Sequence, residues 1–411
     1  MRVAVADKPT LDAIARAVGV GSEHKVYGIK INKRDSNPAT RCTYLMDAVG
    51  MTPAHMNFAT GEFEYGDWAD AWFVKGNFPC MLNADGSIAY KLDPNDYTKK
   101  EDGTASDIAD TSTALNAMSA IPLVYISQYE IGDFKYIFLS DYKVNDSYKA
   151  YAHMKSDGTV KNYVFLSMFN GVLVNTTLRS LSGIQPMHSK TAENEITYAK
   201  ANGTGWFTKT WSQRNLIQCL LTMMFCNTNS QSVLGNGNLN YVNDSSLNYG
   251  KLATGTLNDK GQFWGANDDT HQVKAFHIEG VWANIWDRVA GLVNDKGTIK
   301  AKMYGSYPTS ALTTASTFKD FDVVGKVTPQ GTSGGYISDT LMTEFGDIPY
   351  VASGSASTYE CDGLWFNNSQ VDYARVGGYC AVSSLCGLFC LVLSNAASAA
   401  DWHFGASLSY L

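Results

Sequence analysis

The residues of this sequence that could do chemistry are few and widely spaced. Asp268 and Asp269 stand beside His271 and could hold a cation, although a solvated loop explains the same residues. Residues 331–335 have the spacing of a nucleophile elbow, which needs a strand before the serine and a helix after it. The flanking sequences, TPQ and YISD, favour a glycine- and serine-rich loop instead. We therefore expect no catalytic residue, no metal site and no cofactor.

Eight cysteines could suggest disulfide bonds or a zinc site. No C-x-x-C spacing occurs, so zinc is not indicated. Asp7 and Asp12 occupy the place where a signal peptide would have its apolar core. Because disulfides form mainly in oxidising compartments, a chain without an export signal is expected to keep free thiols. We expect buried cysteines and synthesis in a cytosol.

Composition narrows the class of partner. The 411 residues are 45% hydrophobic and 17% charged, which is typical of a globular protein with room for two or three domains. The net charge of -7 and the absence of a basic run argue against nucleic acid. The apolar run at 386–393 ends at Ser394 and Asn395, well short of the roughly 20 residues of a membrane-spanning helix. We expect no membrane insertion.

The N-terminal segment contains a short predicted helix over residues 10–18. Thr10 can cap it and Gly19 can end it. Its apolar stripe consists of Leu11, Ile14, Ala15 and Val18. A helix this short is marginal alone, so the stripe needs a partner, either the rest of the chain or copies of itself. We interpret residues 1–25 as an attachment or oligomerisation segment.

Strand signals follow from residue 27 onward. Residues 27–31 read as a strand, and the polar run at 99–113 is the best internal boundary. This boundary divides an N-terminal subdomain, 26–115, from a larger domain, 116–411. Residues 121–143 predict a β-hairpin that turns near Gly132, and residues 163–169 predict a further strand.

Two helices are predicted in the larger domain. Thr210 and Gln213 have the spacing of a capping box. They precede a helical apolar face made of Leu216, Ile217, Leu220, Leu221, Met224 and Phe225. The second predicted helix covers 280–293, with Trp282, Ile285, Trp286, Val289 and Leu292 on one side. The long loops around these helices are rich in Gly, Asn and Ser, and loops of this length usually carry function.

The C-terminal residues alternate in character, as expected if they form strands. One parity is apolar and predicts a buried set: Phe389, Leu391, Leu393, Trp402 and Phe404. The other parity is chemically mixed: Cys390, Val392, Ser394, Ala399, Asp401 and His403. If Trp402 is in the core, its truncation to Ala should cost about 3–5 kcal/mol. The mixed set is either a solvated face or a surface that is built to vary.

Residues from about 27 to 411 resemble a known family, most densely in the last 40 residues and more loosely before residue 121. Arg375-Val-Gly-Gly378, the stretch GVWANIWDRV at 280–289, CDGLWFNNS at 361–369 and SNAAS at 394–398 are similar to motifs of proteins that diversity-generating retroelements diversify. Those proteins have a C-type lectin fold related to formylglycine-generating enzymes. LRSLSGIQP at 178–186 resembles a block common in phage tail proteins. The family's R-G-G-S-W lacks its Trp here, and the reactive cysteine pair of the enzyme relatives has no match.

The resemblance implies both a fold and a function. It implies an α+β protein with a C-type lectin fold, long loops and insertions, preceded by a smaller N-terminal region. In that family, miscopied template adenines turn Asn codons into codons for many other residues. Such codons account for the variable region, about 374–411, and for a predicted exposed binding patch of Tyr379, Ala381, Val382, Ser383, Leu385, Cys390, Val392, Ser394, Ala399, Asp401 and His403.

The same resemblance implies a receptor-binding protein rather than an enzyme. We expect a phage tail-fibre or tail-tip protein that binds a host-cell surface protein or glycan. Its further partners would be other tail proteins and copies of itself, commonly as a trimer in the virion. Two alternatives stay open: a structural tail component that binds no receptor, and a tail depolymerase that acts on glycans.

Overall fold

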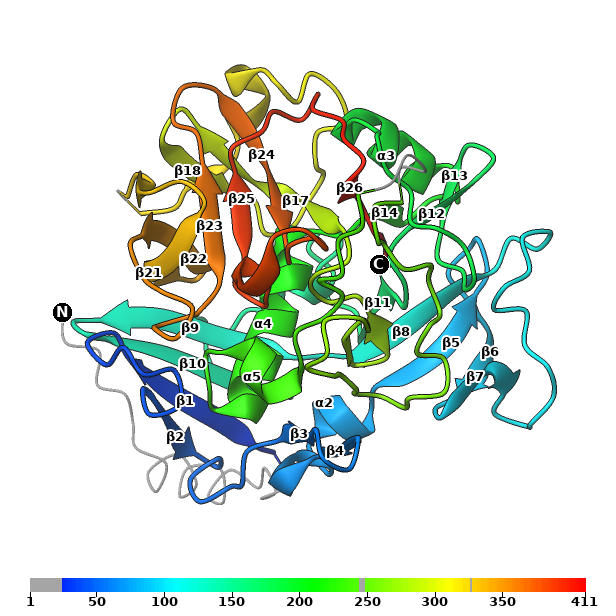
Figure 1. Ribbon diagram of the computed structural model, residues 1–411, viewed down its shortest axis with the longest axis horizontal. Coiled ribbons are helices and arrows are strands. Elements are labelled where there is room, and N and C mark those ends of the chain that lie inside the picture. The colour runs from blue at the N-terminus through cyan, green and yellow to red at the C-terminus, as the bar shows by residue number, and fades with distance from the viewer. Residues whose placement is uncertain (1–23, 244–247, 326) are drawn as a thin grey trace.

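β-Strands make up most of the regular secondary structure (Figure 1). The computed structural model describes residues 24–243, 248–325 and 327–411. Strands take up 34% of the chain and helices 12%, and the several sheets include a curled half-barrel. The expected mixture of sheets and helices is therefore confirmed. The predicted segment 1–25, with its stripe of Leu11, Ile14, Ala15 and Val18, lies almost entirely outside the described residues.

A four-stranded antiparallel sheet forms one side of the molecule. Its strands, in spatial order, are β2 (Cys42–Met46), β1 (Val26–Asn32), β10 (Phe134–Ser140) and β9 (Tyr125–Ile131). Strands β9 and β10 form the predicted hairpin, since Ile131 pairs with Phe134 across the turn. The predicted strand at 27–31 is also confirmed, as part of β1.

A seven-stranded sheet lies next to it. Its strands are β14 (Trp206–Thr208), β27 (Leu408–Tyr410), β11 (Tyr163–Ser167), β8 (Asn116–Pro122), β5 (Phe78–Leu82), β6 (Ile88–Asp93) and β7 (Asp96–Lys100). Strand β11 confirms the strand predicted at 163–169. Residues from both sides of the predicted boundary share sheets, because β1 pairs with β10 and β5 pairs with β8. The division into subdomains stays a prediction.

The third large sheet holds most of the C-terminal part. Its main path is β19 (Asp322–Val323), β18 (Thr298–Ala301), β17 (Trp286–Asp295), β24 (Val371–Val376), β25 (Leu391–Leu393), β23 (Gly363–Phe366), β21 (Gly335–Thr343), β22 (Gly346–Ala352) and β20 (Gln330–Gly331), and β26 (Phe404–Gly405) pairs with β17. Three two-stranded ribbons complete the sheets: β3 (His55–Asn57) with β4 (Glu62–Glu64), β12 (Val172–Val174) with β13 (Thr177–Arg179), and β15 (Lys274–Ala275) with β16 (Ile278–Glu279).

The four α-helices of the described residues are short except for one. They are α2 (Trp72–Lys75), α3 (Ala192–Lys200), α4 (Trp211–Phe225) and α5 (Ser230–Leu234). Helix α4 confirms the first predicted helix, including its capping box. The Thr210 hydroxyl accepts from the Gln213 amide, and the Gln213 side chain accepts from the Thr210 amide at 2.9 Å. These bonds satisfy amide groups that a helix leaves free at its start.

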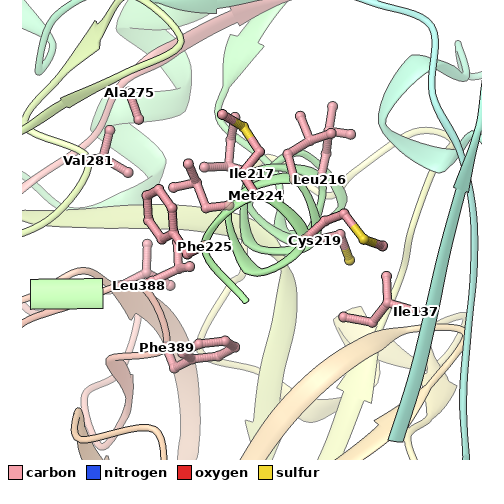
Figure 2. Close-up of a cluster of buried hydrophobic side chains, with 14 of the residues drawn as sticks. Ile137, Leu216, Ile217, Cys219, Met224, Phe225, Ala275, Val281, Leu388 and Phe389 are labelled. Carbon is pink, nitrogen blue, oxygen red and sulfur yellow. The ribbon is translucent and has the colours of Figure 1, made fainter. Parts of the chain in front are cut away.

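Helix α4 is buried around its whole circumference. Ile137 of β10 lies on one side of it, and Leu388 and Phe389 of the C-terminal segment lie on another (Figure 2). A helix that is buried all round must find partners for its polar side chains as well as its apolar ones. This position makes α4 the element that joins the four-stranded sheet to the C-terminal segment.

The second predicted helix, over 280–293, is wrong. Residues from Trp286 onward form strand β17, and the residues before it turn sharply. Gly280, Ala283 and Asn284 have positive φ angles of 70°, 62° and 58°, which a right-handed helix cannot contain. Nine of the ten residues of β17 are buried, since the sheet is covered on both faces. Such a strand has a continuous apolar run whose spacing imitates a helical stripe.

The C-terminal core is confirmed at four of its five predicted positions. Phe389, Leu391, Leu393 and Phe404 are at most 4% exposed. The prediction that Trp402 is buried is wrong, because its side chain is only partly buried. Residues 394–403 form turns and irregular backbone between β25 and β26, so alternation along a strand does not apply to them.

This difference in burial predicts a difference in stability. Phe389→Ala should lower the free energy of unfolding by about 3–5 kcal/mol, since it leaves a cavity against α4. Trp402→Ala should cost less, roughly 1–2 kcal/mol, because part of that side chain stays accessible to water in the folded state. Chemical denaturation of both variants measures the two values. Equal losses would contradict the burial described above.

Candidate binding surface

Five of the eleven predicted patch residues belong to one apolar cluster near the end of the third sheet. Trp286, Cys390, Val392 and Phe404 form its buried part, and Trp365, Tyr379, Val382 and Ala399 pack against them. Five of these eight residues belong to the predicted binding patch. Residues 379–403 are called the display segment below. The display segment therefore folds back on itself over the buried residues of this cluster, which are called the base below.

Nine of the eleven predicted positions are accessible to solvent. Ala381 and Ser383 are fully exposed, and the others are partly exposed: Tyr379, Val382, Leu385, Ser394, Ala399, Asp401 and His403. The prediction of exposure is wrong for Cys390 and Val392, which are 1% and 2% exposed. They lie on or next to β25, which has β23 and β24 as neighbours and is covered on both faces. Neither face of this strand is accessible to solvent, so its side chains cannot contact a partner.

Three glycines close the loop at 379–385. The amide of Gly387 donates to the carbonyl of Gly377 at 3.2 Å, which brings the two ends together. Gly378 has a φ of 95°, and a Cβ there would lie 2.2 Å from the Cys386 Sγ. Only glycine permits both this backbone conformation and this approach. The loop is thus closed by backbone geometry that does not depend on the residues it presents.

Side chains of α4 and α5 hold the end of this loop by its main chain. The Arg214 guanidinium donates to the carbonyls of Val281 at 2.8 Å, Gly387 at 3.2 Å and Leu388 at 2.5 Å. Gln218 also donates to the Leu388 carbonyl, at 3.0 Å. Gln231 donates to the carbonyl of Cys386 at 2.5 Å. All of these acceptors are backbone atoms.

Two further contacts hold the amide groups of the same stretch. The Ser230 hydroxyl accepts from the amide of Leu388 at 3.0 Å, and the Asp362 carboxyl accepts from the amide of Phe389 at 2.7 Å. Burial raises the pKa of Asp362 well above its usual value. Burial also lowers the pKa of Arg214, to about 10, so the guanidinium stays charged at neutral pH. A charged donor makes stronger hydrogen bonds to carbonyls than a neutral one.

The second half of the display segment is held in the same way. Arg288 donates to the Ala399 carbonyl at 2.8 Å, and Lys251 donates to the Trp402 carbonyl at 2.6 Å. The backbone amides of two residues outside the segment, Ser189 and Ala192, donate to the carbonyls of Asp401 and Ala397 at 2.8 Å and 2.9 Å. These bonds fix the course of residues 397–402 although the stretch has no regular secondary structure.

A layer of buried cations lies beneath the apolar cluster. The Arg375 guanidinium lies 3.6 Å from the centre of the Phe404 ring, and that of Arg288 lies 5.7 Å from it. Arg288 pairs with Glu195 of α3 at 2.5 Å, and Arg375 donates to the Asn395 side chain. Burial lowers the pKa of Arg375 well below its usual value. Glu195 and Arg288 are 93 positions apart, and no sequence pattern links them.

Aromatic rings form the rim of the surface. Tyr379 stacks on His403 with ring centres 4.3 Å apart and lies 5.4 Å from Trp402. Trp402 in turn contacts Tyr249 at 4.3 Å, and Tyr249 lies 6.1 Å from the exposed Tyr241. The two tyrosines were not predicted. The only sequence signal for them was their place in a long loop rich in Asn, Ser and Gly.

His403 is neutral at physiological pH. Burial lowers its pKa to about 4, although Asp401, whose carboxylate lies 3.4 Å from the Nδ1 atom, opposes the shift. The stack of Tyr379 on His403 is therefore a contact between two uncharged rings. This part of the surface is suited to apolar and hydrogen-bonding contacts rather than to ion pairing.

The other chemistry considered from sequence is explained by local structure. Ser333 of the elbow-like stretch exchanges hydrogen bonds with the backbone of Phe366, and no helix follows it. His271 and Asp268 form an exposed pair at 2.8 Å. Across the described ranges, no group of three or more His, Cys, Asp or Glu residues could hold a metal ion. All eight cysteines are free thiols, as expected, and seven of them are buried.

A cavity of about 270 Å³ lies far along the chain from the display segment. His277 lines it, together with Asn77, Gln262 and Tyr65. The Tyr65 hydroxyl donates to Gln262, and Gln262 donates to Asn77. His277 is hydrogen-bonded to the buried Tyr97 at 2.7 Å. These lining groups bond to one another, which indicates a structural network.

No helix within the described parts of the chain is both long and apolar enough to cross a membrane.

The contacts of Arg214 lead to a prediction about local order. Arg214→Met leaves the carbonyls of Val281 and Gly387 without their side-chain donor, at roughly 1–3 kcal/mol for each unsatisfied group, while the Leu388 carbonyl keeps its bond from Gln218. Amide hydrogen exchange should become faster at residues 386–389 well below the melting temperature. Arg179→Met is the matched control, since Arg179 is also buried and donates to backbone carbonyls, those of Thr113 and Leu115. If both variants affect 386–389 equally, Arg214 does not hold the loop.

Comparison with known proteins does not assign the chain to a family. No protein-family model matches the chain, and no curated protein is detectably similar to it in sequence. We therefore infer the function from the arrangement of the display segment and from the motifs at 280–289, 361–369, 375–378 and 394–398.

Proposed function

We propose that this protein is a receptor-binding protein of a phage tail, with a variable surface built on a C-type lectin fold. The display segment presents the surface, and a host-cell surface protein or glycan is the partner. One observation carries the proposal. Nine positions selected from the sequence alone are accessible to solvent, and they belong to a segment that is packed over one cluster and fixed through its main chain.

The way the segment is held supports variation at these positions. Arg214, Arg288 and Lys251 bind backbone carbonyls, and every residue type supplies the same carbonyl. A new side chain at an exposed position leaves these bonds in place. Exposed substitutions usually change stability by no more than about 0.5 kcal/mol. The protein can thus change what it presents without changing its fold.

The motifs that carry the family resemblance lie close together in space. Arg375 of the Arg-Val-Gly-Gly motif bonds to Asn395 of SNAAS. Trp286 of the GVWANIWDRV stretch contacts Trp365 of CDGLWFNNS, with ring centres 5.5 Å apart. Motifs from four separate stretches therefore build the base of the display segment. This is what a shared scaffold beneath a variable surface requires.

Cys390 and Val392 have a different place in this proposal. Both side chains are in the apolar cluster, so only residues of similar size fit without strain or a cavity. We assign them to the base and not to the surface that touches a receptor.

Binding energy would be concentrated in the aromatic rim. Tyr379 lies at its centre and contacts His403, Trp402 and Trp286. Aromatic residues often carry a large share of binding energy, and truncating one can cost roughly 2 kcal/mol or more. Several copies on one virion, for which we propose a trimer, would raise the avidity of a weak site by a factor of about 10² or more.

The diversification claim has a test in the genome. A near-copy of the 3′ end of the gene should lie close to it, with Asn codons at the variable positions and a reverse transcriptase gene nearby. A neighbourhood without either element would contradict diversification by this route, although it would leave receptor binding open.

Receptor binding itself is tested by replacing the nine accessible positions together. In this variant Tyr379, Ala381, Val382, Ser383, Leu385, Ser394, Ala399, Asp401 and His403 become Asn, while Cys390 and Val392 are kept. The melting temperature should change by only a few degrees, and adsorption of labelled protein to host cells should be lost. The control replaces exposed apolar residues elsewhere, Ile88, Val160 and Val323, with Asn. Adsorption that survives in the first variant would favour a structural tail component.

A further inference from the structure

The four-stranded sheet has one buried face and an outer face that carries a row of aromatic side chains, with Lys30 of β1 and Thr43 of β2 on the same side. Along β10, Lys135, Ile137 and Leu139 are at most 3% exposed and face the interior. Ile137 and Leu139 belong to the same core cluster as helix α4. Because residues of a strand alternate between faces, Phe134, Tyr136 and Phe138 lie on the other side. Phe138 is 6% exposed and is therefore already covered, whereas Phe134 and Tyr136 are partly exposed.

The aromatic rings on the outer face lie against one another. Tyr136 is paired with Tyr129 of β9, with ring centres 5.3 Å apart and planes 25° apart. Tyr136 also lies 6.4 Å from Phe138 with nearly parallel planes. Gly28 of β1 stands opposite Phe138, and a Cβ there would lie 2.9 Å from its ring. The glycine lets the aromatic row lie flat across the sheet.

Large apolar side chains are unusually exposed at the margins of this sheet. Val49, just beyond β2, is 68% exposed, and Ile131, at the end of β9, is 64% exposed. These are the two highest values for large apolar residues in the described part of the chain. Phe134, Tyr129 and Tyr136 are each partly exposed as well. An apolar face with exposed margins is typical of a surface that another segment covers.

The chain enters this sheet directly from the N-terminal segment, through β1. The predicted helix over 10–18 would be about 13 Å long, at 1.5 Å per residue. The seven residues that follow it can span at most about 24 Å before β1 begins. A seven-residue strand is about 20–23 Å long, so the whole outer face is within reach of residues 10–18 of the same chain.

We propose that the outer face of the β2–β1–β10–β9 sheet is the docking surface for the stripe Leu11, Ile14 and Val18 of the same chain. The stripe needs an apolar partner, and the face offers one beside the point where the chain enters. The short linker gives the segment a high effective concentration at its own sheet. The segment of a second copy would compete only if its concentration near the sheet were higher. The proposal does not depend on receptor binding, and it places trimer contacts elsewhere.

Disulfide trapping in the full chain tests the proposal. The variant carries Ile14→Cys and Tyr136→Cys, with Cys226→Ser because Cys226 is the one native cysteine that is not buried. In a glutathione redox buffer the new pair should form a disulfide within one chain. The matched control keeps Ile14→Cys and Cys226→Ser but pairs them with Val323→Cys, at an exposed position on the third sheet. The crosslinked fraction should exceed that of the control at least about tenfold.

Each other outcome overturns the proposal. A disulfide that joins two chains would assign the face to a second copy. Equal crosslinking in test and control would show that residues 10–18 do not prefer this face. A second measurement avoids cysteines: Tyr136→Asp should speed amide exchange at residues 10–18 at least about tenfold, whereas Val323→Asp should not. If Tyr136→Asp leaves the exchange unchanged, the stripe does not dock on the aromatic row.

Discussion

The buried guanidinium of Arg214 is the contact on which the display segment most depends. It carries its charge in the interior without a directly paired carboxylate, and it bonds instead to three main-chain carbonyls. Burial of an arginine is costly unless its donors are satisfied. Here the donors hold the backbone of Gly387 and Leu388 in one position. These hydrogen bonds offset part of the cost of burial, and they fix a stretch that has little regular structure of its own.

The same principle recurs along the whole segment. Arg288 and Lys251 bind backbone carbonyls at residues 399 and 402, and Asp362 binds a backbone amide at residue 389. Polar side chains of the scaffold bind peptide groups, while the side chains of the segment are either accessible to solvent or buried in the small apolar cluster and the main core. Recognition of peptide groups separates the stability of the fold from the identity of the presented residues. That separation is the physical basis of the proposed function.

The sequence was informative where local signals act alone. The capping box at Thr210, the hairpin of β9 and β10, and the four buried apolar residues of the C-terminus are all confirmed. Sequence patterns failed where a strand is buried on both faces, because such a strand does not alternate between apolar and polar residues. Strand β17 was predicted as a helix for this reason. Cys390 and Val392 were predicted to be exposed but lie in the core. Sequence patterns also failed at Trp402, because its stretch is held by long-range hydrogen bonds rather than by strand pairing. Contacts between residues more than a hundred positions apart, such as Lys251 with Trp402, leave no periodic trace in the sequence.

The most direct test of the account is amide hydrogen exchange on the variant in which all nine accessible positions of the display segment are Asn. The amides of Leu388 and Phe389 are bonded to Ser230 and Asp362, which the substitutions leave unchanged. Their protection in the variant should therefore equal that of the original chain. Loss of protection at these two amides, with the rest of the core unaffected, would show that the presented side chains hold the segment in place and would contradict the account.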